Sequence, residues 1–324
     1  MGQVISFLRK LVSGREGVVP VNRIATNAEK LGTVCSKLGE GPFYDRGTDT
    51  AWWFDIVGRR LLEHRFRGGD TIVHDLPRIG SVIAPVDEKR QLLAMDDGLY
   101  LRDIADGSLS LIKALEADKA GNRSNDGRLH PSGRLWVGTM GRNAEWQAGT
   151  IYLFDGSEIT PLFRKVTIPN SICFSPDGRT GYFADTAANT VWRVALDPRT
   201  AVPIGEPEVF LTEAQLPLGG HYDGSVMDAD GILWNAAWGG GSVTGFAPDG
   251  SIVRTFELPA AQTSCPCFVG PKLDRMAVTS AWEGYSAAAR NADPGAGFTY
   301  IIDGGFNGTV SPAALIDESI LNRN

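Results

Sequence analysis

Three short segments of the sequence place an oxygen-bearing side chain beside glycine or proline, just before a strand-like run. They are Gly39-Glu40-Gly41-Pro42, Pro169-Asn170-Ser171 and Tyr222-Asp223-Gly224. Glycine and proline set the local backbone, so that the polar side chain can be aimed at a ligand. Two carboxylates and one carboxamide are hard donors that suit calcium, magnesium or manganese, and zinc is tolerated. Glu40, Asn170 and Asp223 are therefore predicted to bind one divalent metal ion.

A fourth polar segment, Arg123-Ser124-Asn125-Asp126-Gly127-Arg128, offers a cation and an amide. Such groups can hydrogen-bond hydroxyls or a carbonyl, so Arg123 and Asn125 are candidate substrate-binding residues. Each of the four segments alone is also typical of a turn, because Asn and Asp bond their own backbone there. Their common position ahead of a strand favours one shared site over four unrelated turns.

The elements that must position these residues recur along the chain. A polar turn is followed by an apolar strand, a small or acidic break and a second strand. Three copies of the turn and first strand align without gaps, at residues 130–140, 175–185 and 228–237. The second strands of these copies are expected at 149–154, 190–194 and 242–246.

Weaker copies of the same unit lie at residues 44–60, 87–102 and 271–282. About six units at a period of roughly 40 to 50 residues are typical of a β-propeller. We predict an all-β, six-bladed β-propeller that forms a single domain over residues 31–324, preceded by an N-terminal extension over residues 1–30. A β-sandwich or jelly roll is the alternative architecture. In a propeller, polar groups from the inner ends of distant blades can meet around one ion.

Five separated motifs resemble those of the gluconolactonase and regucalcin family, also called senescence marker proteins. They are Gly39-Glu40-Gly41-Pro42, Arg123 with Asn125-Asp126-Gly127, Gly138-Thr139-Met140, Pro169-Asn170, and Asp223-Gly224 with Asp228-Ala-Asp-Gly-Ile-Leu-Trp234. The match runs from about Leu38 to Trp282. The resemblance implies a six-bladed propeller whose central divalent ion is held by Glu40, Asn170 and Asp223. It also places Asn125 and Arg123 beside the metal and the substrate, and it implies a lactonase that acts on aldonolactones in sugar-acid metabolism.

The sequence departs from the family pattern after Gly138-Thr139-Met140. Relatives often carry an acidic residue there that contacts sugar hydroxyls, whereas this chain has Gly141-Arg142-Asn143. Asn143 is included as a candidate substrate-binding residue, and the sugar preference stays open. Ser171 also stands where a glycine is common.

Hydrolysis of a small sugar lactone needs a polarised carbonyl and an activated water, both of which a divalent ion can supply. Asp223 is predicted to be the general base, with Arg123 and Asn125 orienting the substrate. Two other functions use the same metal site. One is hydrolysis of an organophosphate or another ester, and the other is a calcium-binding or scaffolding propeller without catalysis.

Composition and charge narrow the possible partners. The net charge of -7 and the pI near 5.2 argue against the positively charged surface that nucleic-acid binding needs. The four cysteines are too few and too irregularly spaced for a disulfide framework, so buried free thiols are expected. No apolar run reaches the roughly 20 residues that cross a bilayer. We expect a cytoplasmic monomer that does not bind a membrane.

Overall fold

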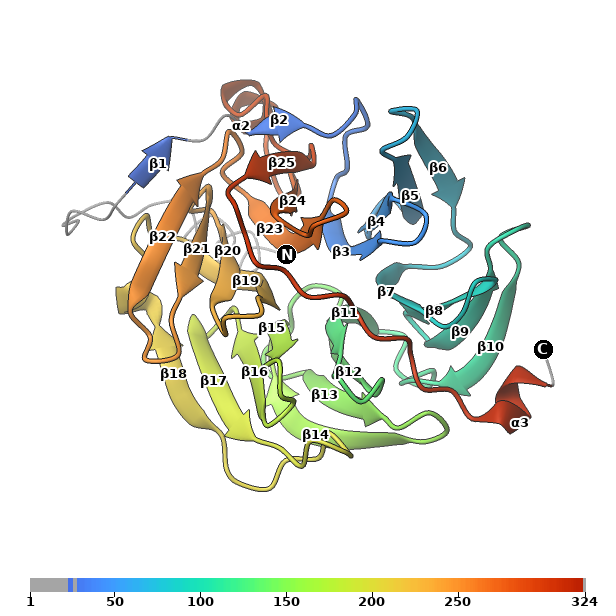
Figure 1. Ribbon diagram of the computed structural model, residues 1–324. Helices are drawn as coiled ribbons and strands as arrows, with labels where there is room; N and C mark the ends of the chain where they lie inside the picture. The colour runs from blue at the N-terminus through green and yellow to red at the C-terminus, as the bar shows by residue number, and fades with distance from the viewer. Residues whose placement is uncertain (1–22, 26–27, 323–324) are drawn as a thin grey trace.

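The computed structural model describes residues 23–25 and 28–322, and these fold into six mainly antiparallel sheets arranged as blades around a channel (Figure 1). The predicted all-β, six-bladed propeller is confirmed, and the sandwich alternative is excluded. The innermost strand of each blade is the first in chain order, apart from two short outer strands that come from the beginning of the described chain. Each of these inner strands contacts the inner strands of both neighbouring blades, which closes the ring.

The strands of the first three blades follow one another along the chain. Blade 1 contains β3 (Gly39–Asp45), β4 (Thr50–Asp55), β5 (Arg60–Arg65) and β6 (Thr71–Asp75). Blade 2 contains β7 (Gly80–Pro85), β8 (Arg90–Met95), β9 (Gly98–Asp103) and β10 (Leu109–Ala114). Blade 3 contains β11 (Asn122–Leu129), β12 (Leu135–Gly141), β13 (Gly149–Phe154) and β14 (Ile159–Val166).

The last two blades also take in strands from the beginning of the chain. Blade 4 contains β15 (Pro169–Phe174), β16 (Thr180–Asp185), β17 (Thr190–Ala195) and β18 (Glu208–Thr212). Blade 5 contains β19 (His221–Met227), β20 (Leu233–Trp238), β21 (Ser242–Phe246) and β22 (Ile252–Glu257), with β1 (Arg23–Ala25) parallel to β22. Blade 6 contains β23 (Thr263–Val269), β24 (Arg275–Ser280), β25 (Tyr300–Asp303) and, as its outermost strand, β2 (Glu29–Lys30).

Blade 6 closes the ring by pairing a strand from near the beginning of the described chain with strands from near its end. Glu29 pairs with Ile301 and Lys30 pairs with Tyr300 in antiparallel register. Both β1 and β2 fall inside the range 1–30 that we assigned to an extension, so two short pieces of that range take part in propeller sheets. Residues 1–22 and 26–27 of the predicted extension lie outside the described residues.

Apolar side chains fill the space between neighbouring blades. Trp136 and Trp234 are buried there, and Trp192 is partly buried. The indole of Trp234 donates a hydrogen bond of 2.8 Å to Asp228 Oδ2. That same carboxylate accepts bonds from the backbone N–H groups of Asp230 and Ile232, which stabilises the polar turn before β20. The repeated turn thus positions the strand and also fixes its packing residue.

The C-terminal strap, residues 306–315, crosses one end of the central channel (Figure 1). Its first part is bonded to blade 6, where the N–H groups of Phe306 and Gly308 donate to the carbonyls of Asp274 and Leu273. Its last part is bonded to blades 2 and 3, where Ala314 donates to Pro85 and Leu315 to Gly133. The strap therefore bridges opposite sides of the ring.

Helices are few and short in the described part of the chain: η1 (Glu213–Gln215), α2 (Ala287–Ala292) and α3 (Glu318–Leu321). None of these helices has the length or the apolar character to cross a membrane. Cys173, Cys265 and Cys267 are buried free thiols, as predicted, whereas the free Cys35 is partly exposed.

Candidate functional site at the carboxylate end of the channel

All six inner strands share an irregularity near their first residues. The pairing of each inner strand with its neighbour shifts register there, in the intervals Glu40/Phe43, Gly80/Val82, Ser124/Gly127, Asn170/Cys173, Tyr222/Ser225 and Thr263/Pro266. A β-bulge bends the strand and re-aims its side chains. The predicted metal ligands Glu40, Asn170 and Asp223 all lie at these bulges, on β3, β15 and β19.

Three carboxylates are buried together at this end, which we call the carboxylate end. Glu40, Asp126 and Asp223 all lie inside the ring and influence one another's charge. Burial, with the charge of Asp126 second, raises the pKa of Glu40 to about 8. Burial, followed by the charges of Glu40 and Asp126, raises the pKa of Asp223 well above its usual value. Without an added cation, the ionised forms of both groups are therefore disfavoured.

A chain of hydrogen bonds links the arginine and the two amides. Arg123 Nη1 donates to Asn125 Oδ1 over 2.7 Å, and Asn125 Nδ2 donates to Asn170 Oδ1 over 2.9 Å. Asn170 Nδ2 in turn donates to Thr186 Oγ1 over 2.8 Å. Because Thr186 fixes the amide nitrogen, the oxygen of Asn170 is held toward Asn125. The amide of Asn125 is thus occupied in positioning Arg123 and Asn170.

Ser171 supports Asp223 from the neighbouring blade. Its backbone has φ of 52°, the left-handed region in which glycine is easier to accommodate. Its hydroxyl donates to the backbone carbonyl of Asp223 over 2.6 Å and accepts bonds from Ser225 Oγ and Asn235 Nδ2. Ser171 therefore adds a buried hydrogen-bonding group beneath the site.

Replacement of Ser171 separates the two effects at this position. Ser171→Ala is expected to lower the free energy of unfolding by about 1–3 kcal/mol, because buried partners of the hydroxyl lose their bonds. Ser171→Gly loses the same bonds but relaxes the left-handed backbone, so we expect a smaller loss. Urea unfolding of both variants measures the difference. An alanine variant as stable as the parent chain would show that these hydrogen bonds contribute nothing.

Hydrogen bonds link three of the predicted site residues, Arg123, Asn125 and Asn170. The charge of Glu40 acts on both Arg123 and Asp223, so these two residues belong to the same cluster. Asn143 is not part of this network. Its exposed side chain donates to Glu145 Oε1 in the loop after β12. That loop lies at the same end of blade 3 as Arg123, since Asn122 pairs with Gly141. A role for Asn143 in substrate binding stays a prediction.

Sequence reasoning did not place Asp126, Thr186 or Glu283 in the site. Asp126 is held by the backbone N–H groups of Gly127 and Ile172, which bond its two carboxylate oxygens. Glu283 faces Arg123 electrostatically, and burial raises the pKa of its carboxyl. Asp126 could have been suspected from the segment that also contains Arg123 and Asn125. Thr186 and Glu283 carry no comparable signal in the sequence.

The residues present fit a divalent ion by their chemistry. Within the described residues there is no group of three or more His, Cys, Asp or Glu side chains that could hold a metal. The predicted set contains only two acids, Glu40 and Asp223, with the amide of Asn170. All three are oxygen donors, and the two acids are buried carboxylates whose ionisation a cation would favour.

Comparison with known proteins identifies the family. The family model described as the SMP-30/Gluconolactonase/LRE-like region matches residues 38–282. The chain belongs to this family. The resemblance predicted from the five motifs is thereby confirmed, and the matched interval contains Glu40, Asn170 and Asp223 in the inner strands of three blades.

Individual members of the SMP-30/gluconolactonase/LRE-like family are similar over most of the chain. A protein of Rhizobium meliloti (strain 1021), named provisionally as a sugar lactone lactonase, is 51% identical over 283 residues, which are 87% of this chain and 95% of that protein. The pentonolactonase of Haloferax volcanii is 32% identical over 264 residues, 81% of this chain and 87% of that one. The crystal structure of regucalcin from Agrobacterium tumefaciens strain C58, described as a calcium-binding protein, matches with a TM-score of 0.87 and 46% identity, covering 91% and 99% of the two chains.

Proposed function

We propose that this chain is a metal-dependent lactonase that opens a sugar lactone to its sugar acid. The observation that carries the proposal is the pair of buried carboxylates, Glu40 and Asp223, beside an oriented amide and an arginine. Membership of the SMP-30/gluconolactonase/LRE-like family supports it, as do the lactonase names of similar proteins. The calcium-binding description of the regucalcin structure supports the metal.

Glu40, Asn170 and Asp223 are the residues that would hold the ion. A divalent ion supplies Lewis acidity for a carbonyl oxygen and lowers the pKa of water. Calcium, magnesium and manganese suit the all-oxygen donor set, and zinc is compatible with it.

The chain's own residues account for proton transfer and substrate orientation. Asp223 accepts the proton of the attacking water as general base. Burial and the charge of Glu40 raise the pKa of this carboxyl, which favours proton acceptance, and a bound cation would act in the opposite direction. Within the described residues, Arg123 donates hydrogen bonds only through Nη1, to Ser124 and Asn125. Its remaining N–H groups are available to the lactone ring oxygens and to developing negative charge.

Proton release from a panel of five- and six-membered aldonolactones tests the proposal. Metal-stripped protein is expected to be inactive, and adding back calcium, magnesium, manganese or zinc in turn is expected to restore turnover with at least one ion. Turnover that survives complete removal of metal would contradict metal dependence. Tight metal binding without turnover of any lactone would contradict the lactonase assignment, and a phosphotriester substrate would then distinguish an esterase from a calcium-binding propeller.

A further inference from the structure

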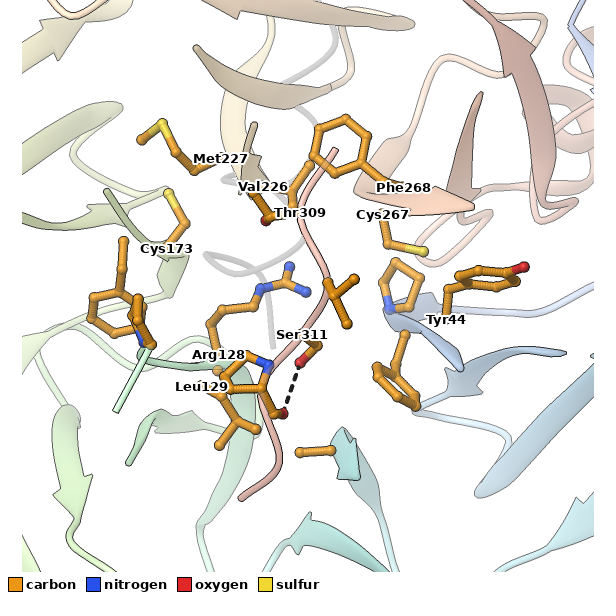
Figure 2. A pocket seen from close by; sticks show the side chains of 18 of the residues that line it. Tyr44, Arg128, Leu129, Cys173, Val226, Met227, Cys267, Phe268, Thr309 and Ser311 are labelled. Carbon is orange, nitrogen blue, oxygen red and sulfur yellow. Dashed lines mark hydrogen bonds between the residues drawn. The ribbon is translucent and has the colours of Figure 1, made fainter. Parts of the chain in front are cut away.

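A cavity lies in the channel toward the end opposite the carboxylates, beneath the C-terminal strap (Figure 2). Its volume is about 280 Å³, and its walls come from the ends of the inner strands. Apolar side chains such as Leu129, Phe174, Val226 and Phe268 dominate these walls. Thr309 to Pro312 of the strap also contribute to them. We call this space the strap cavity.

One partly buried cation reaches into the strap cavity. Figure 2 shows the guanidinium of Arg128 among the lining side chains, with Cys173 and Cys267 on opposite sides. Arg128 Nη2 donates to the carbonyl of Ser225 over 3.0 Å and lies 3.8 Å from Cys265 Sγ. Its Nε is buried and has no hydrogen-bond partner, and no ion pair to Arg128 occurs among the described residues. Arg128 is therefore a partly buried charged group that still has donors free.

The nearby acidic groups do not neutralise this cation by contact. Asp126 influences Arg128 electrostatically, but its two oxygens are directed to the N–H groups of Gly127 and Ile172. The thiols around Arg128 stay protonated, because burial raises the pKa of Cys267 to about 12 and raises those of Cys173 and Cys265 as well. A partly buried charge with an unpaired buried donor carries a desolvation cost, and a bound anion relieves that cost.

We propose that the strap cavity binds a small organic monocarboxylate with an apolar body, its carboxylate on Arg128 and its body against the apolar walls. A guanidinium pairs with a planar carboxylate through parallel N–H donors, and Arg128 has such donors unused. The volume equals that of roughly nine water molecules at about 30 Å³ each, which is enough for a six-carbon acid. The strap covers the bound molecule, and its anchored ends leave Thr309 to Pro312 as the part that opens.

Isothermal titration of the full chain with sodium hexanoate tests this proposal. The protein is stripped of metal, so that the probe has no ion to coordinate at the carboxylate end. Hexanoate is expected to bind with a stoichiometry of one, and the uncharged hexan-1-ol is expected to bind at least roughly 10-fold more weakly because it cannot pair with the guanidinium. No binding of hexanoate, or equal binding of hexanol, overturns the proposal.

Matched variants locate the binding site. Arg128→Met keeps the length of the side chain and removes its charge, and it is expected to weaken hexanoate binding roughly 10-fold or more. Arg46→Met makes the same change at an exposed arginine of the same cavity and is expected to leave the affinity within about twofold. Affinity lost in Arg46→Met but retained in Arg128→Met overturns the assignment.

A second variant keeps the test decisive if Arg128→Met does not fold. Val310 lines the cavity from the strap and is 57% exposed, so the fold tolerates a larger side chain there. Val310→Trp retains Arg128 and fills part of the cavity, and it is expected to weaken hexanoate binding by roughly 10-fold. Undiminished binding in this folded variant places hexanoate elsewhere and overturns the proposal.

Discussion

Replacing Asp223 with asparagine is expected to reduce lactone turnover by roughly 1,000-fold or more while leaving the metal-free fold at least as stable as before. The loss of activity follows because the variant lacks both the proposed base and an anionic ligand. The retained stability follows because Asp223 is a buried carboxylate whose ionised form is disfavoured by burial and by Glu40. kcat/KM at saturating metal and Tm in chelator measure the two effects on one preparation.

Asp228→Asn is the matched control, since it makes the same change five residues later in the same blade. Asp228 accepts hydrogen bonds from Trp234 Nε1 and from two backbone N–H groups, and it is a structural residue of the repeated turn. We expect this variant to lose about 1–3 kcal/mol of stability and to keep its activity within about twofold when folded. An active Asp223→Asn, or an inactive but folded Asp228→Asn, would refute the assigned roles.

The stability of the metal-free protein is expected to fall as the pH rises from about 5 to about 9. Glu40 has a folded-state pKa near 8, compared with 4.5 for the unperturbed group. The folded state therefore binds a proton more tightly than the unfolded state does. This contribution to stability is fully present below pH 4.5 and is lost as the pH rises through about 8, amounting to a few kcal/mol.

Urea unfolding in the presence of chelator, repeated across this pH range, measures the effect. Glu40→Gln is the control, and its stability is expected to depend less steeply on pH than that of the parent chain. A saturating divalent ion is expected to stabilise the parent more at pH 8 than at pH 5, because its ligands must be deprotonated. If the free energy of unfolding in chelator changes equally with pH in the parent chain and in Glu40→Gln, Glu40 is not the source of the pH dependence.

The fold could be predicted because its repeat is local. The strands predicted at 149–154 and 242–246 coincide with β13 and β21, since turn residues and apolar runs mark both ends of each strand. The strand β2 could not be predicted in this way. Its two residues pair with β25 from the other end of the chain, and so short a segment has no pattern of its own.

The site could be predicted only as far as single residues and their types reveal it. Glu40, Asn170 and Asp223 stand out because each polar group precedes a strand and adjoins glycine or proline. Asp126 and Ser171 look like ordinary turn residues in the sequence, and their contacts depend on how bulges of neighbouring blades meet in the channel. A binding role for Arg128 could not be predicted from the sequence, because the strap cavity forms only when residues 309–312 fold back over the ring.

The pairing of β2 with β25 also determines when the ring can close during synthesis. Glu29 and Lys30 emerge from the ribosome about 270 residues before their partners Tyr300 and Ile301. At ordinary elongation rates this delay is on the order of tens of seconds, during which the blades made first wait as an open arc. The arc exposes unpaired strand edges that invite association with other chains. The last strand to be made therefore ends the interval in which the nascent protein is most open to aggregation.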